Sequence, residues 1–109
     1  MKSKKKIYLT PEEIQSASEP FWVPGKPVMI IQSFGWCVVG FYVRHETPLR
    51  IKMIHINHFR NAGTDYGTIA REGPAPDCEW RYEGSGTVNL THELRTLDYG
   101  GEVPRSALR

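Results

Sequence analysis

The sequence predicts a mainly β domain of the α+β class: a small curled antiparallel sheet, or a partly open barrel, of about five strands, with a short N-terminal helix and one short inserted helix. Its 109 residues suffice for one domain with a single modest core. Hydrophobic residues make up 39% of the chain, which is enough apolar material to fold. Short runs of β-branched and aromatic residues, separated by turn residues, favour strands over long helices.

The N-terminal part of the chain, residues 1–26, combines a basic tail, a short helix and an aromatic arm. Residues 9–18 are typical of a helix because Thr10 is a good N-cap and Pro11 suits the first helical position. Glu13, three residues after the cap, completes a capping box. The Glu-Pro pair that follows ends the helix, since a residue before proline avoids helical geometry.

Residues 27–97 form the predicted strand-rich domain. Its strands are expected at residues 27–32, 36–45, 49–56, 78–83 and 87–97. Gly40, in the middle of the second strand, predicts the bulge or sharp bend that a curling sheet requires. Most aromatic side chains on these strands, Trp36 among them, are expected in the core of so small a domain. The glycine-rich tail, residues 98–109, is expected to be flexible.

Two interruptions divide these strands. Residues 57–63 form a polar break, and residues 64–72 form a second short helix capped by Thr64 or Asp65. Further on, Gly84-Ser85-Gly86 is expected to be a hairpin turn.

The net charge of +2 is unevenly distributed. Lys2, Lys4, Lys5 and Lys6 are four of the fourteen basic residues, and the remaining ten face twelve acidic ones. The folded part is therefore mildly acidic and lacks the broad basic patch typical of nucleic-acid-binding proteins. We expect the lysine run to be a solvated tail, with an arm that binds nucleic acid as the alternative.

The expected cellular location follows from the residues after the lysine run. No apolar segment long enough for a signal peptide or a membrane span follows it, so we expect a cytoplasmic protein with no membrane partner. Cys37 and Cys78 are then expected to be reduced thiols. Cys37 lies in an apolar run and is expected to be a small core residue.

Three segments carry a resemblance to a known family. They are Trp36-Cys-Val-Val-Gly, Arg50-Ile-Lys-Met and Asn61-Ala-Gly-Thr-Asp-Tyr-Gly-Thr-Ile-Ala-Arg-Glu-Gly. Across residues 27–97 this layout resembles a family of small proteins encoded by phages and prophages. The family has no established activity, so the resemblance implies no catalytic residues. It implies a phage-associated accessory protein in the host cytoplasm.

The densest polar cluster lies where the second helix begins. Free N–H groups at a helix start attract anions, Arg60 offers a charged fork, and Phe59 or Tyr66 could stack on a base. Asp65 would oppose an anion, and local helix capping is the alternative explanation of this composition. The candidate ligand- or partner-binding residues are Asn57, His58, Phe59, Arg60, Asn61, Thr64 and Tyr66.

A second candidate is a contact surface of aromatic side chains. Its residues are Phe21, Trp22, Trp80, Arg81 and Tyr82. Phe21 and Trp22 have an alternative role, which is to pin the N-terminal arm onto the body.

No pattern indicates catalysis, a metal or a cofactor. His55 and His58 point to opposite faces if the third strand continues, and neither cysteine lies in a Cys-x-x-Cys pair. Glu79 and Glu83 share a strand face with Arg81, which is typical of a solvated, charge-balanced surface. We therefore expect a protein that binds rather than reacts.

The leading functional hypothesis is a non-enzymatic, phage-associated protein that modulates a host process. The expected partner is a host protein, such as a defence factor, or a small nucleotide signal that the protein sequesters. One alternative is a nucleic-acid-binding module that uses the lysine arm and exposed aromatic residues. The other is a structural protein that assembles as a homo-oligomer.

Overall fold

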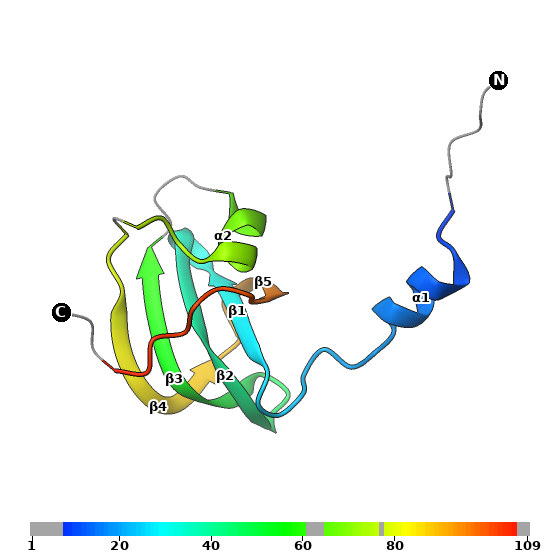
Figure 1. Cartoon of the computed structure of the whole chain (residues 1–109). Coiled ribbons are helices and arrows are strands. Elements are labelled where there is room, and N and C mark those ends of the chain that lie inside the picture. Colours follow the sequence, from blue (N-terminus) through cyan, green and yellow to red (C-terminus); the bar gives the residue numbers. More distant parts are fainter. Residues whose placement is uncertain (1–7, 61–64, 77, 107–109) are drawn as a thin grey trace.

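The structure, a computed structural model, describes residues 8–60, 65–76 and 78–106. The described residues form one five-stranded antiparallel sheet in the order β4-β3-β2-β1-β5, with two short helices (Figure 1). The strands are β1 Pro27–Gln32, β2 Trp36–Thr47, β3 Arg50–Arg60, β4 Arg81–Asn89 and β5 Glu93–Asp98. The helices are α1 Pro11–Ala17 and α2 Tyr66–Glu72, and a 3₁₀ turn, η1 Ser33–Gly35, joins β1 to β2. The predicted strand-rich fold is confirmed.

The sheet is curled because of how its edges connect. β4 and β5 are the two edge strands of the sheet, yet only residues 90–92 join them. Three residues span about 10 Å, far less than the width of a flat five-stranded sheet. The ends of the two edge strands must therefore approach each other, which bends the sheet into a partly open barrel.

Gly40 lies at the bend in β2, as expected. The register between β2 and β3 shifts between Val39 and Phe41, so the hairpin bulges at this point. A Cβ at Gly40 would lie 3.1 Å from the carbonyl oxygen of Ile54. Opposite it, His55 has a φ of 52°, which marks the irregular backbone on β3.

Apolar side chains cover both faces of the sheet. The inner, concave face holds Val28, Ile30, Val38, Tyr42, Ile51, Met53, Ile56, Val88 and Leu90. The outer face holds Met29, Ile31, Cys37, Val39 and Phe59, and it is covered by Ile69 and Ala70 of α2 and by Tyr99. Cys37 is thus a core residue, and no disulfide joins it to Cys78.

The two turns predicted from polar composition are not where the sequence placed them. β4 runs through Gly84, Ser85 and Gly86 without turning, because Gly86 pairs with Met53 and Gly84 pairs with Ile56. Gly84 has a φ of 79° and serves an irregularity within the strand. The chain turns at residues 90–92 instead. There the side chain of Asn89 accepts a hydrogen bond from the backbone N–H of Thr91 at 2.8 Å.

The polar break predicted at residues 57–63 is also wrong in its first half. β3 continues to Arg60 and pairs with β2 up to the Trp36–Arg60 pair. Asn57 is fully buried and Phe59 nearly so, since the outer face of β3 is covered. Residues 61–64 lie outside the described part of the chain.

The segment after β5 packs against the outer face, unlike the flexible tail that its glycines suggested. Tyr99 is buried, and its hydroxyl donates a hydrogen bond to the carbonyl of Glu102 at 2.8 Å. Further along, the side-chain N–H of Asn57 donates to the carbonyl of Pro104 at 2.9 Å. The described C-terminal residues therefore form part of the fold.

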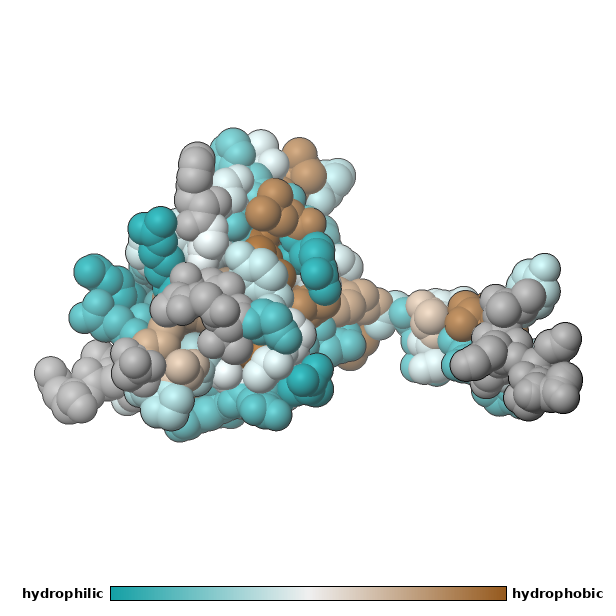
Figure 2. All heavy atoms as spheres, turned by 90° about the horizontal axis from the view of Figure 1, so that it is seen from above, coloured by the Kyte–Doolittle hydropathy of each residue, from teal (hydrophilic) through white to brown (hydrophobic). Residues whose placement is uncertain are grey.

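α1 has the predicted capping box but stands away from the body. The backbone N–H of Glu13 donates to the Thr10 hydroxyl at 3.1 Å, and the Glu13 carboxylate accepts from the Thr10 N–H at 2.7 Å. None of its residues is buried, and Ile14 is 52% exposed. Figure 2 shows this helix separated from the body by a narrow segment of chain. Neither described helix is long and apolar enough to cross a membrane.

Candidate functional site

The structure divides the predicted polar cluster between the two faces of β3. Side chains alternate along a strand, so Asn57 and Phe59 point to the covered outer face while His58 and Arg60 point to the inner face. Asn57 is used structurally, because its amide nitrogen donates to the carbonyls of His55 and Pro104, each at 2.9 Å. Of these four residues, only His58 and Arg60 line the concave surface.

The start of α2 is a poor anion site. Asn61 and Thr64 lie outside the described residues, and Tyr66 packs against the outer cluster. The cap is Asp65, whose carboxylate accepts hydrogen bonds from the N–H and the hydroxyl of Thr68 at 2.8 and 3.0 Å. These bonds lower the pKa of Asp65, so a negative charge already occupies the helix start.

The aromatic arm is fixed to the body. The Trp22 ring lies 5.0 Å from that of Tyr42 and 5.2 Å from that of His45, between ring centroids. The Lys26 ammonium lies 3.8 Å above the Phe21 ring and forms an ion pair with Asp98 at 2.5 Å. Phe21 and Trp22 thus have the geometry of a pin between the arm and the sheet.

The other three residues of the predicted contact surface do not form one surface. Trp80 packs on the outer face, 5.1 Å from the Phe59 ring. The Tyr82 hydroxyl lies 2.9 Å from Nδ1 of His55. Arg81 is exposed and pairs in register with His58, so it belongs to the inner face.

The inner face instead presents Trp36 at its rim. Trp36 is the first residue of β2, is 36% exposed, and lies directly opposite Arg60 on β3. The guanidinium carbon of Arg60 is 6.0 Å from the centre of the Trp36 ring, and the His58 ring is 5.0 Å away in an edge-on arrangement. An indole is therefore held at the surface between two basic side chains.

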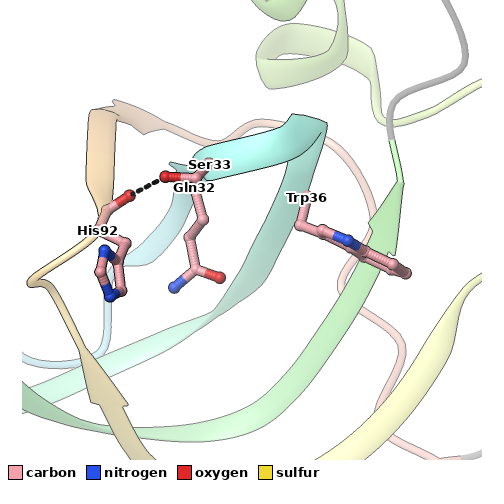
Figure 3. Close-up of a pocket in the computed structure, with 4 residues that line it drawn as sticks. All are labelled: Gln32, Ser33, Trp36 and His92. Atoms are coloured by element: carbon pink, nitrogen blue, oxygen red, sulfur yellow. Dashed lines mark hydrogen bonds between the residues drawn. The ribbon is translucent and has the colours of Figure 1, made fainter.

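Two hollows meet at Trp36. The first, of about 240 Å³, is lined by Gln32, Ser33, Trp36 and His92 (Figure 3). The second, of about 270 Å³, is lined by Gln32, Trp36, Val38, His58 and Glu83. Both hollows are lined by Gln32 and Trp36 and so adjoin at these residues, and we call the two together the Trp36 groove.

Hydrogen bonds fix the walls of this groove. The Ser33 hydroxyl donates to the backbone carbonyl of His92 at 3.5 Å, which ties η1 to the β4–β5 turn (Figure 3). His58 Nδ1 lies 2.7 Å from a carboxylate oxygen of Glu83, which ties β3 to β4. Both walls are therefore held by contacts between segments far apart in the sequence.

The charged side chains around the groove differ in whether they already have an ion-pair partner. Glu83 is engaged by His58. Arg60 and Arg81 are exposed, and neither forms an ion pair with another described residue. Arg60, opposite Trp36, and Arg81, on the neighbouring strand of the same face, are therefore two cationic groups without an ion-pair partner among the described residues.

Of the residues that line the groove, sequence reasoning predicted His58 and missed the other six: Gln32, Ser33, Trp36, Val38, Glu83 and His92. Trp36 was expected in the core and Glu83 on a solvated face. The available signal was the alternation along β3, in which His58 and Arg60 flank Phe59 and so share one face. His92 carried no such signal, because the turn that positions it was not recognised.

The described residues contain no group of three histidine, cysteine, aspartate or glutamate side chains placed to hold a metal ion. No protein-family model matches the chain, and no curated protein is significantly similar to it.

Proposed function

We propose that this domain is a binding protein whose Trp36 groove takes up nucleotides, either free or as part of a single strand. The observation that carries the proposal is the exposed Trp36 ring between two hollows, with Arg60 opposite it and Arg81 nearby on the same face.

The indole supports recognition of a base. Every nucleobase has a π-face, and stacking on an aromatic side chain contributes roughly 1–3 kcal/mol per base. Trp36 is suited to this contact because its backbone is fixed by pairing with Arg60 while its ring remains partly exposed.

The arginines support recognition of a phosphate. A guanidinium matches the geometry of a phosphate and can donate two hydrogen bonds to it. Arg60 and Arg81 occupy neighbouring strands on the inner face, and Arg81 lies opposite His58 in register. Glu83, the carboxylate in the groove lining, already contacts His58 Nδ1 at 2.7 Å.

The groove favours binding over reaction. The only hydroxyl among its lining residues, that of Ser33, donates to the His92 carbonyl, and the lining residues include no cysteine or lysine. A nucleophile with an adjacent base is the arrangement that covalent catalysis needs. We therefore keep the prediction that the protein is not an enzyme.

The resemblance to phage-encoded proteins supplies a biological setting for this proposal. In that setting, the ligand is a nucleotide signal of the host or a single strand exposed during infection. Both remain proposals, as does the antagonism of a host defence.

The test is a fluorescence titration of the full chain with AMP, UMP and single-stranded DNA twelve-mers. Stacking on Trp36 predicts that the ligand quenches tryptophan fluorescence. Trp36→Phe should lose this quenching because the indole is gone, and Trp36→Ala should bind the ligand more weakly because no ring remains for stacking. Arg60→Ala is expected to weaken binding about tenfold, whereas Arg44→Ala, at the far end of β2 and paired with Glu46, is the matched control and should have no effect. The proposal is overturned if the protein binds none of these three probes.

Salt dependence separates the two sources of the ligand. On a single strand, each neutralised phosphate contributes about −0.7 to the slope of log K against log salt concentration. If a strand is the ligand, Arg60→Ala should make this slope shallower by about 0.7. If the ligand is a free nucleotide, length beyond the unit that fills the groove should add no affinity, so a short free nucleotide should bind as tightly as the twelve-mers.

A further inference from the structure

The Trp36 groove has two compartments of nearly equal size. The hollow toward the β4–β5 turn has about 240 Å³ and the hollow toward β3 and β4 about 270 Å³. Sites that hold a drug-sized ligand have roughly 300–1,000 Å³. Each compartment alone is therefore below that range and suits a fragment such as a single base.

Trp36 stands at the junction of the two compartments. It lines both hollows, so one indole can serve a base in either of them. The remaining walls differ, with Ser33 and His92 in the first compartment and His58 and Glu83 in the second. Each compartment can therefore be altered without touching the other.

Gln32 is the second residue that both compartments share. Its side chain projects into the hollow between His92 and Trp36 (Figure 3) and forms no hydrogen bond with another described residue. A primary amide offers a donor and an acceptor side by side. Base edges present the same kind of pattern, so Gln32 can meet the edge of a base in either compartment.

We infer that the ligand unit of this groove is a dinucleotide, with one base in each compartment and Trp36 and Gln32 between them. This inference rests on the proposed function and adds to it a site size of two. In this arrangement the linking phosphodiester faces Arg60 and Arg81, which are exposed on the neighbouring strands β3 and β4 of the same sheet face.

The test is a length series of adenylates carrying a 5′-phosphate: the mononucleotide, the linear dinucleotide and the trinucleotide. Addition of the second base should tighten binding by about ten- to a hundredfold, because a second compartment becomes filled. Addition of the third base should change affinity less than about threefold. Calorimetry gives the affinity and stoichiometry of each.

Two variants block the compartments separately. Ser33→Tyr fills the first compartment and Glu83→Tyr alters the second, and each should reduce the dinucleotide's affinity to about that of the mononucleotide. Neither should abolish mononucleotide binding, since the other compartment stays open. Thr87→Tyr, at an exposed position further along β4, is the control and should leave the length series unchanged. Thermal melting of each variant verifies that it is folded.

The outcomes separate this inference from the proposed function. Equal affinities for mononucleotide and dinucleotide overturn the two-compartment site while leaving the nucleotide groove intact. A gain that continues at each added base also overturns it, because the site would then follow a strand. No binding by any member of the series overturns both.

Discussion

The amide nitrogen of Asn57 donates a hydrogen bond to the carbonyl of Pro104, 47 residues away, at 2.9 Å, and this bond fixes the C-terminal segment to the sheet. The same nitrogen donates to the carbonyl of His55 within β3. Asn57 is fully buried, and its oxygen has no partner among the described residues. An unpartnered buried oxygen costs free energy, and the two bonds to the carbonyls offset at least part of that penalty.

Substitution of Asn57 should therefore release the C-terminal segment. Asn57→Ala leaves two carbonyls without this donor and is expected to lower the free energy of unfolding by about 1–3 kcal/mol. Backbone amides of residues 99–103 should exchange faster in hydrogen-exchange experiments. Ser85→Ala, at an exposed position on β4, is the control. Unchanged exchange in Asn57→Ala would show that the segment is held by its apolar contacts alone.

Gly40 and Gly86 should respond differently to the same substitution. A Cβ at Gly40 would lie 3.0 Å from the Met53 methyl, 3.1 Å from the Ile54 carbonyl and 3.2 Å from the His55 carbonyl. Backbone atoms cannot move away easily, so Gly40→Ala is expected to cost about 1–3 kcal/mol of stability. At Gly86 the closest atom is the Ile56 methyl at 3.7 Å, an ordinary contact. Gly86→Ala should be neutral or stabilising by up to about 1 kcal/mol in urea denaturation.

Stability should fall in alkaline solution because of Cys37. Burial, with a smaller contribution from Cys78, raises the pKa of Cys37 from 9.0 to about 11. Between these values the unfolded chain loses the thiol proton while the folded chain keeps it, so the free energy of unfolding decreases as pH rises. The expected loss is on the order of 2–3 kcal/mol across this window.

Urea denaturation at pH 8 and pH 10.5 measures most of this loss, since pH 10.5 lies within the window. Cys37→Ala should lower stability at both pH values but show a smaller difference between them. A residual slope is expected from Tyr99, since burial, followed by the charge of Glu102, raises its pKa from 10.0 to about 12. An equal pH difference in the variant and the parent would assign the whole effect to other groups.

Trp22 should hold the N-terminal arm against proteases. Its ring contacts the rings of Phe21, Tyr42 and His45. Trp22→Ala is expected to cost about 2–4 kcal/mol and to expose the arm to rapid cleavage between α1 and β1 under limited proteolysis. Val23→Ala changes an exposed neighbour and should leave the cleavage rate unchanged. Similar rates in the two variants would mean that the Lys26–Asp98 ion pair anchors the arm instead.

The sequence by itself determined features that depend on neighbouring residues. The capping box of α1 requires only Thr10 and Glu13 three residues apart, and it formed as expected. The strand content followed from β-branched and aromatic runs, and the bend at Gly40 from the absence of a side chain. Each of these effects acts over a few residues, so the sequence displays both partners at once.

Only the tertiary structure decided the length of β3, the course of β4 and the location of the groove. Asn57 is polar and was assigned to a break, but a distant carbonyl at Pro104 gives its side chain a buried partner. Gly84 resembled a turn residue, yet pairing with Ile56 keeps it in a strand. Trp36 stays partly exposed because the sheet curls and leaves hollows beside it. In each case the deciding contact joins residues far apart along the chain, and strand pairing and face coverage are set only when the whole sheet closes.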